Sequence, residues 1–246
     1  MGASAHRIGA LARHRVVLLR RSPGQVVVYT VMACLLTLVV EPMAELLPTA
    51  GVAAPPGARA AAGMLVFCSL FMAGVAGAAV VDERVWRTAE RLRSTPARPA
   101  ELLAGTALPL LGLLLVQQVV VLVVASTLYP TGLGPHWPRL LGVGTAWAAC
   151  VLGIGLLLAA VTTTSAQLST VKDLTALALS TTGGAVVPLA ALPSWLAPAG
   201  RFSPAYWAVA GYLGGPAPAG TAVAVLAGVA VVTFATATLL LGRRRP

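Results

Sequence analysis

The sequence predicts an all-α integral membrane protein with six transmembrane helices, and three observations lead to that fold class. Of the 246 residues, 58% are hydrophobic and 10% are charged, whereas soluble domains have about 45–50% apolar and about 25% charged residues. The apolar residues gather in six runs, each near the roughly 20 residues that a membrane-spanning helix needs. The basic residues gather in alternate connections between these runs. Because no room remains for a soluble domain, we expect a single transmembrane domain over residues 1–246.

The first apolar run is the least uniform of the six, because Glu41 and Glu45 interrupt its far end. An acid within a span is a candidate functional residue. The alternative is a solvated rim, since both side chains lie near the outer mouth of the span. The six expected spans are Val26–Leu47, Ala60–Val81, Leu102–Leu128, Leu140–Val161, Leu174–Leu192 and Thr221–Leu241.

The distribution of Lys and Arg predicts the orientation of the chain. Of these 17 residues, 14 lie in the N-terminus, in the connections after the second and fourth runs and at the C-terminus. The other connections hold only Arg59, Arg139 and Arg201. The positive-inside rule therefore places both termini in the cytoplasm. The net charge of +10 is then explained by topology and by contacts with membrane lipids, so we expect no nucleic acid partner.

Residues 1–21 predict a cytoplasmic amphipathic helix that lies along the inner leaflet. Leu11, Ala12 and Leu19 share one helical face, whereas Arg13 and Arg20 lie largely on the opposite face. This separation of apolar and basic residues is typical of interfacial helices. A disordered basic tail is the alternative.

The connection over residues 82–101 predicts a second amphipathic helix, between spans two and three. It holds 9 of the 24 formally charged residues of the chain, so it cannot lie in hydrocarbon. Glu83 and Arg87 are four apart in the order that favours a helical ion pair. Pro96 ends the helix, and Pro99 suits the first turn of the next one. Apolar residues recur at helical spacing at Val85, Trp86, Ala89 and Leu92.

Two pairs of residues within spans two and three are candidates for a role beyond packing. Phe67 and Phe71 either line a hydrophobic pathway or pack between helices. Gln117 and Gln118 either bond to a neighbouring helix, as amides at mid-membrane depth commonly do, or form a ligand site.

The end of the fifth run and its following loop predict a re-entrant hairpin on the outer face, over residues 193–217. Gly184 and Pro188 interrupt the run, and the loop that follows is rich in proline yet still apolar. Irregular backbone at membrane depth is tolerated where protein covers it or where it lines a cavity. Trp195 and Trp207 suit the interface between lipid and water.

Motifs for nucleotide, metal or nucleophilic chemistry are absent from the sequence. The phosphate-binding pattern G-x-x-x-x-G-K-[ST] does not occur, and the only lysine is Lys172. The three histidines are not arranged as a metal site, and no G-x-S-x-G is present. We therefore expect no catalytic residue and no cofactor in this chain. The energy for any transport would come from another chain.

The stretch ERVWRTAERLRSTPARPAELLAG resembles the ABC-2 type transporter permeases, especially the small bacterial subunits that export drugs and natural products. Arg87 stands where that family usually has Gly, Arg93 where it has an apolar residue, and Thr106 where Lys is common. The residues that fall on the family pattern are Glu83, Arg84, Thr88, Glu90, Arg91, Leu92, Thr95, Pro96, Glu101, Leu102, Leu103 and Gly105. A second, outer motif is matched by Gly184, Pro188, Leu192, Pro193, Trp195, Pro204 and Tyr206.

The resemblance implies a bacterial plasma-membrane permease that acts with a separate ATP-binding cassette subunit, which would hold ATP and Mg²⁺. Two permeases, identical or paralogous, would pair. The helix within residues 82–101 would be the coupling helix, and the N-terminal helix would contact the same subunit. The expected coupling residues are Glu83, Arg84, Trp86, Arg87, Glu90, Arg91, Leu92, Thr95 and Pro96. The residues expected along the substrate pathway, which would follow spans one, two and five, are Phe67, Phe71, Thr181, Gly184, Pro188 and Glu41.

Export of a hydrophobic drug or natural product is the function that these observations favour. Lipid or glycan export by the same machinery is the nearest alternative. A third possibility is a membrane protein with a structural or assembly role, which would not need the coupling pattern. Residues 82–101 would then be only a solvated loop that fixes the topology. An integral-membrane enzyme would need convergent polar residues within the spans, and the sequence lacks them.

Overall fold

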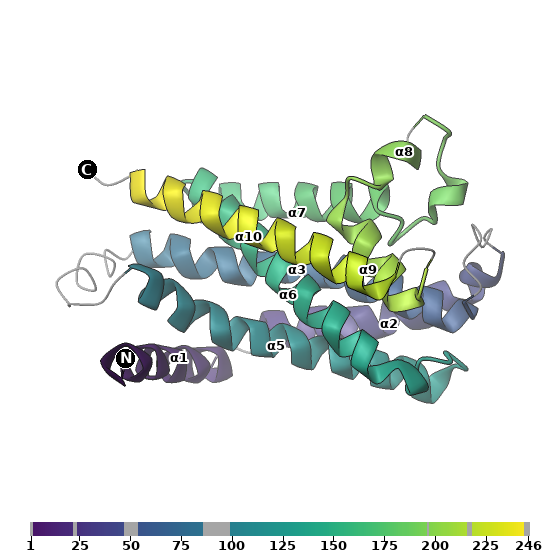
Figure 1. Cartoon of the computed structure of the whole chain (residues 1–246), viewed down its shortest axis with the longest axis horizontal. Coiled ribbons are helices and arrows are strands. Elements are labelled where there is room, and N and C mark those ends of the chain that lie inside the picture. The colour runs from purple at the N-terminus through teal and green to yellow at the C-terminus, as the bar shows by residue number, and fades with distance from the viewer. Residues whose placement is uncertain are drawn as a thin grey trace.

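The computed structural model describes residues 2–21, 24–46, 54–85, 99–195, 197–215 and 218–243, and every regular element in these ranges is a helix. The helices form an elongated bundle (Figure 1). The long helices are α1 (Gly2–Arg21), α2 (Gly24–Leu46), α3 (Pro56–Val85), α5 (Pro99–Leu128), α6 (Trp137–Val161), α7 (Ser165–Thr182) and α10 (Ala219–Arg243). The short elements are η1 (Gly134–His136), η2 (Leu189–Ala191), α8 (Ala197–Gly200) and α9 (Pro204–Leu213).

Five helices in the described ranges are long and apolar enough to cross a membrane: α2, α3, α5, α6 and α10. They coincide with five of the six expected runs. The start of α5 at Pro99 also confirms that this proline lies in the first turn of its helix. The expected all-α membrane fold is thus confirmed, with five candidate spans.

The expected boundaries of the fifth span, Leu174–Leu192, were wrong. Helix α7 begins nine residues earlier, at Ser165, because Thr164 caps it: the Thr164 hydroxyl accepts a hydrogen bond from the Gln167 backbone N–H at 3.2 Å. Helix α7 ends at Thr182, ten residues before the expected end, and Gly184 follows at φ 79°, a left-handed conformation that suits glycine. Helix α7 therefore includes Lys172, which the sequence placed in a connection, and it is not among the five candidate spans.

The centre of the bundle is formed by α3 and α6. Of their apolar windows, 78% and 83% of the residues are buried, against 11% for α2 and 17% for α10. Glycine allows the close approach of α3 and α6: a Cβ at Gly155 would meet the backbone carbonyl oxygen of Ala73. Small residues at such crossings are the usual means by which membrane helices pack. Helix α10 packs along α6, and α2 packs along α3.

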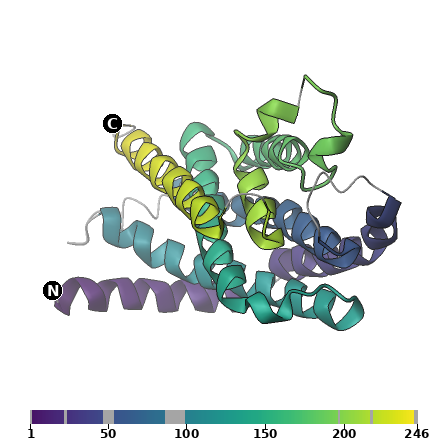
Figure 2. The same ribbon diagram turned by 45° about the vertical axis from the view of Figure 1, so that its right-hand side comes forward.

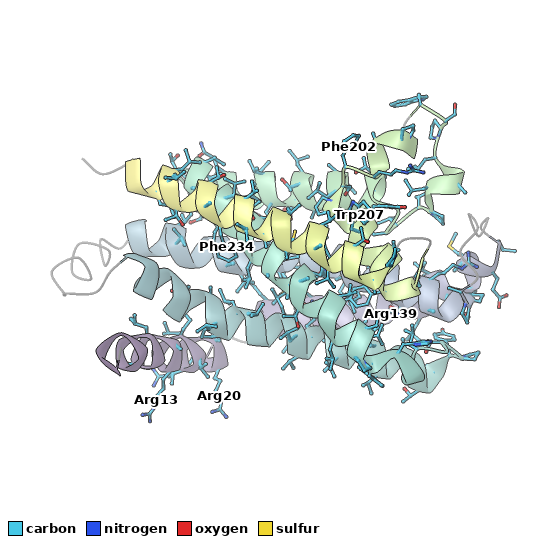
Figure 3. The ribbon with its side chains drawn as sticks, in the orientation of Figure 1. Arg13, Arg20, Arg139, Phe202, Trp207 and Phe234 are labelled. Carbon is cyan, nitrogen blue, oxygen red and sulfur yellow. The ribbon has the colours of Figure 1, made fainter. Side chains whose placement is uncertain are left out.

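Helix α1 packs against the first part of α5 (Figures 1 and 2). A Cβ at Gly105 would lie 2.6 Å from the Cβ of Leu11, so glycine permits this contact. Leu11 and Leu19 are half-buried, whereas Arg13 and Arg20 are exposed and point away from the bundle (Figure 3). The structure therefore has a helix over Gly2–Arg21, and the predicted amphipathic role of this segment on the inner leaflet stays a prediction.

One end of the bundle gathers the segments that the charge pattern assigned to the cytoplasm. The end of α3, the start of α5 and the end of α10 lie together there, next to α1 (Figure 1). Helices α8 and α9 lie toward the opposite end. Which membrane face each end meets stays a prediction.

The described part of residues 193–217 contains the short helices α8 and α9. Helix α9 packs against α6 and α10, and Gly214, which has φ 69°, caps its C-terminus. Arg139 Nη2 donates a hydrogen bond to the Tyr212 carbonyl at 3.2 Å, where a cation is favourable because carbonyls at a helix end lack partners. These contacts return the chain to the bundle. A re-entrant path through a membrane stays a prediction.

Candidate functional site

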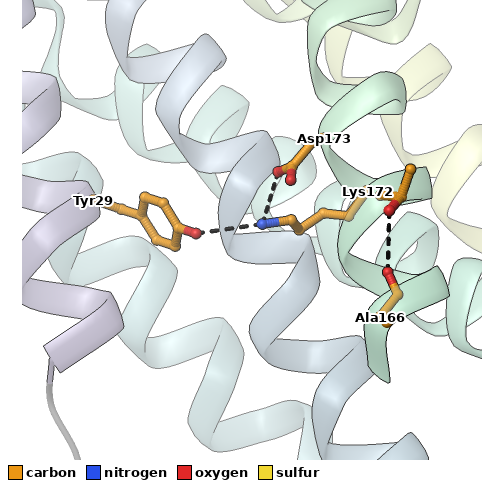
Figure 4. Close-up of polar contacts among 5 residues, drawn as sticks. Tyr29, Ala166, Lys172 and Asp173 are labelled. Carbon is orange, nitrogen blue, oxygen red and sulfur yellow. Dashed lines mark hydrogen bonds and ion pairs between the residues drawn. The ribbon is translucent and has the colours of Figure 1, made fainter. Parts of the chain in front are cut away.

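Lys172 joins three helices at one point. Its ammonium nitrogen lies 2.9 Å from Asp173 Oδ1, and it donates a hydrogen bond to the Tyr29 hydroxyl at 3.3 Å (Figure 4). Tyr29 belongs to α2 and Lys172 to α7, and both helices pack against α3. The lysine side chain thus connects two helices across the third.

A glycine on α3 makes room for the lysine. A Cβ at Gly74 would meet Cδ of Lys172, so the aliphatic part of the lysine lies directly on the α3 backbone. This contact brings the four-carbon stem of Lys172 close to the bundle interior while its charged group reaches Tyr29. Amphipathic side chains commonly divide in this way.

Two aromatic rings lie beside the ammonium group, and a third ring packs on one of them. The Tyr29 and Phe71 rings stack with their centroids 5.8 Å apart, and Phe67 meets Phe71 edge to face at 5.1 Å. The Lys172 nitrogen lies 5.6 Å from the Tyr29 centroid and 5.5 Å from the Phe71 centroid. Both distances are within the roughly 6 Å range of a cation–π interaction. We call Tyr29, Phe67, Phe71, Lys172 and Asp173 the lysine cluster.

The two charges of the lysine cluster differ in their contact with water. The side chain of Lys172 is 10% exposed, and that of Asp173 is 51% exposed. A buried ammonium is costly unless it is paired and hydrogen-bonded. Asp173, Tyr29 and the two ring faces together supply that compensation. Of the two charged groups, Asp173 is the one in greater contact with solvent.

The predicted pathway residues do not form one site. Phe67 and Phe71 lie together in the lysine cluster, in the middle of α3. Thr181 and Gly184 lie at and just beyond the end of α7, and Pro188 precedes η2. Glu41 is half-buried near the end of α2 and takes no part in the cluster.

Sequence reasoning missed Tyr29, Lys172 and Asp173 as site residues. Lys172 is the only lysine of the chain, but the apolar run that begins at Leu174 placed it outside the span. The signal that would have included it is the capping sequence: Thr164 and Gln167 start a helix that carries Lys172 inward.

Most of the predicted coupling residues lie outside the described residues: Trp86, Arg87, Glu90, Arg91, Leu92, Thr95 and Pro96. Helix α3 continues to Val85, so the backbone of Glu83 and Arg84 forms its last turn. The coupling helix itself stays a prediction.

Of the two adjacent glutamines in α5, Gln118 bonds to a neighbouring helix. Gln118 Oε1 accepts a hydrogen bond from the Tyr212 hydroxyl at 2.9 Å, which links α5 to α9. Both residues are buried, as is Gln117. Among the described residues, Gln117 Oε1 and Gln118 Nε2 have no hydrogen-bond partner.

The long apolar helices, their close glycine contacts and the basic residues at one end define a multi-pass helical membrane protein. A family model described as ABC-2 type transporter matches residues 6–215. The chain therefore belongs to the ABC-2 type transporter family, whose members are membrane permease subunits, as the sequence resemblance predicted. Comparison with curated proteins gives no match for this chain.

Proposed function

We propose that this chain is the permease subunit of an ATP-driven exporter in a bacterial plasma membrane, moving a hydrophobic drug or natural product out of the cell. Its partners are a separate ATP-binding cassette subunit and a second permease, identical or paralogous. Membership of the ABC-2 type transporter family supports the transport role.

The observation that carries the proposal is the arrangement at the basic end of the bundle. The end of α3 and the start of α5 lie together there, and α1 packs on α5 beside them. A segment that joins α3 and α5 at this point is well placed to transmit a movement to the central helix α3. ATP-driven closure of a partner subunit needs such a rigid connection into the membrane.

The exposed apolar faces of the bundle are evidence for contact with a second permease copy. On α2, Val28, Leu35 and Val39 are 59%, 56% and 65% exposed, and on α7 Leu174 is 63% exposed. These two helices flank α3, which contributes Phe67 and Phe71. Substrate would then pass along α2, α3 and α7, between the two permeases.

Transport by the reconstituted complex of permease and ATP-binding subunit tests the proposal. In proteoliposomes, Glu83→Arg should leave ATP hydrolysis in place but uncouple it from export, because it reverses a charge of the proposed coupling segment. Arg201→Glu is the matched control. Arg201 is exposed, and it lies in one of the connections that the charge distribution assigns to the outer side of the membrane. Normal export by a correctly folded Glu83→Arg variant would contradict the coupling role.

A further inference from the structure

The ammonium group of Lys172 has capacity for one more acceptor. A lysine carries three N–H donors. Asp173 and Tyr29 accept from two of them, and no third acceptor is found in the part of the chain that the structure describes. Aromatic faces from α2 and α3 lie beside this remaining donor.

We propose that the lysine cluster binds an amphipathic anion, and this inference rests on the permease function proposed above. The anionic group, a carboxylate, sulfonate or phosphate, binds the Lys172 ammonium. The apolar body of the same molecule lies against the rings of Tyr29, Phe67 and Phe71. The substrate class of the exporter is therefore acidic as well as hydrophobic.

The exposure of the two charged side chains favours an anion over a cation. An incoming anion accepts from the remaining donor of Lys172, and Asp173, already 51% exposed, can turn toward water to reduce the repulsion between the two anions. An incoming cation would instead bind Asp173 and remove it from Lys172. That exchange leaves a buried ammonium without its charge partner, which is strongly unfavourable.

The aromatic rings favour a ligand with an apolar, preferably planar, body. Tyr29, Phe67 and Phe71 are each half-buried, so part of each ring is available to a ligand. Covering apolar surface contributes about 25 cal/mol per Å², and aromatic pairs prefer stacked or edge-to-face contact. An anion without an apolar body would forgo this contribution.

The lysine cluster lies near the middle of α3 and in the first half of both α2 and α7. Tyr29 is about 8 Å along α2 from its first residue and Lys172 about 11 Å along α7 from its first residue, at 1.5 Å per residue. The arginines at the basic end of the bundle would attract an anion toward the protein. The anion comes either from the cytoplasm as a free molecule or from the inner leaflet as a lipid headgroup.

Photolabelling of the purified full-length permease, in nanodiscs of phosphatidylcholine, tests the proposal. The probe is benzophenone-4-carboxylate, and its matched cation is 4-(aminomethyl)benzophenone. We expect saturable labelling of α2 and α3 peptides by the carboxylate, with at least about tenfold weaker labelling by the amine, as expected for a charge-assisted hydrogen bond.

Neutralising Lys172 and neutralising Asp173 should change carboxylate binding in opposite directions. Lys172→Gln should weaken carboxylate binding by about tenfold or more, whereas Asp173→Asn should strengthen it by about threefold, because a competing, partly exposed carboxylate is removed. Lys172→Arg should retain binding. If Lys172→Gln does not fold, as judged by gel filtration, Asp173→Asn and Lys172→Arg still decide the outcome.

Unchanged or weaker carboxylate binding by Asp173→Asn would overturn the proposal, as would equal labelling by the two probes. Repeating the assay with phosphatidylglycerol in the nanodiscs distinguishes the two sources of the anion. Competition by this lipid identifies a headgroup, and undiminished labelling identifies a free anion. Because the assay needs neither ATP nor a partner, its failure would leave the permease assignment intact, and a failure of coupling would leave this site intact.

Discussion

At the scale of single residues, polar side chains inside the bundle bind to one another across helices. Trp147 Nε1 donates to Ser69 Oγ at 2.6 Å, and the Tyr212 hydroxyl donates to Gln118 Oε1 at 2.9 Å. All four residues are buried. In a membrane interior such bonds contribute modestly, since the unfolded chain also finds partners.

We predict that Tyr212→Phe lowers the stability of the bundle by about 1 kcal/mol, because Gln118 loses its donor while remaining buried. Thermal unfolding of the purified protein in mild detergent measures the effect. Tyr129→Phe is the matched control, since the Tyr129 hydroxyl makes only a 3.4 Å bond to the Leu38 carbonyl. Equal losses for the two variants would contradict this account of Tyr212.

Residue types alone predicted part of the lysine cluster. Phe67 and Phe71 were recognisable as neighbours on one helix, because they are four apart within an apolar run. Tyr29 could not be linked to Lys172 from the sequence, since 143 positions separate them. Only the packing of α2 and α7 on opposite sides of α3 brings them together.

At the scale of the elements, glycines determine how closely the central helices approach. We predict that Gly155→Ala lowers the unfolding temperature in detergent, with a loss of about 1–3 kcal/mol. The new Cβ would meet the carbonyl oxygen of Ala73, a backbone atom that cannot rotate away.

Gly142→Ala, on the same helix, is the matched control for this prediction. A Cβ at Gly142 would have no neighbour within 4 Å, so the substitution should be neutral or should stabilise α6 by up to about 1 kcal/mol through helix propensity. A loss at Gly142 as large as the loss at Gly155 would show that the crossing with α3 is not the cause.

The five long apolar helices could be predicted at this scale because length and hydropathy alone identify them. Helix α7 could not, because its polar first half carries Lys172 and Asp173 and its start depends on a capping hydrogen bond of Thr164. A capping hydrogen bond does not change the hydropathy of the sequence. The helix expected from hydropathy alone therefore lies too close to the C-terminus.

At the scale of the whole molecule, the basic residues and the fold predict the same two ends. We predict that Phe202→Cys is labelled by a membrane-impermeant thiol reagent in intact cells, whereas Arg13→Cys is labelled only after permeabilisation. Phe202 is 91% exposed, and Arg13 is exposed on α1. The native Cys68 and Cys150 are buried, whereas Cys34 is half-buried, so both variants are made in a Cys34→Ala background. Labelling of Arg13→Cys in intact cells would reverse the proposed orientation.

The central claim is that a separate ATP-binding subunit binds the basic end of this permease and drives transport. Co-purification tests this claim most directly. The protein, purified in mild detergent, should carry a stoichiometric partner with a phosphate-binding loop, identified by mass spectrometry. Glu90→Arg should remove that partner while the permease still inserts and folds, and Arg201→Glu should retain it. A permease that purifies alone, or with a partner that has no nucleotide site, would contradict the account.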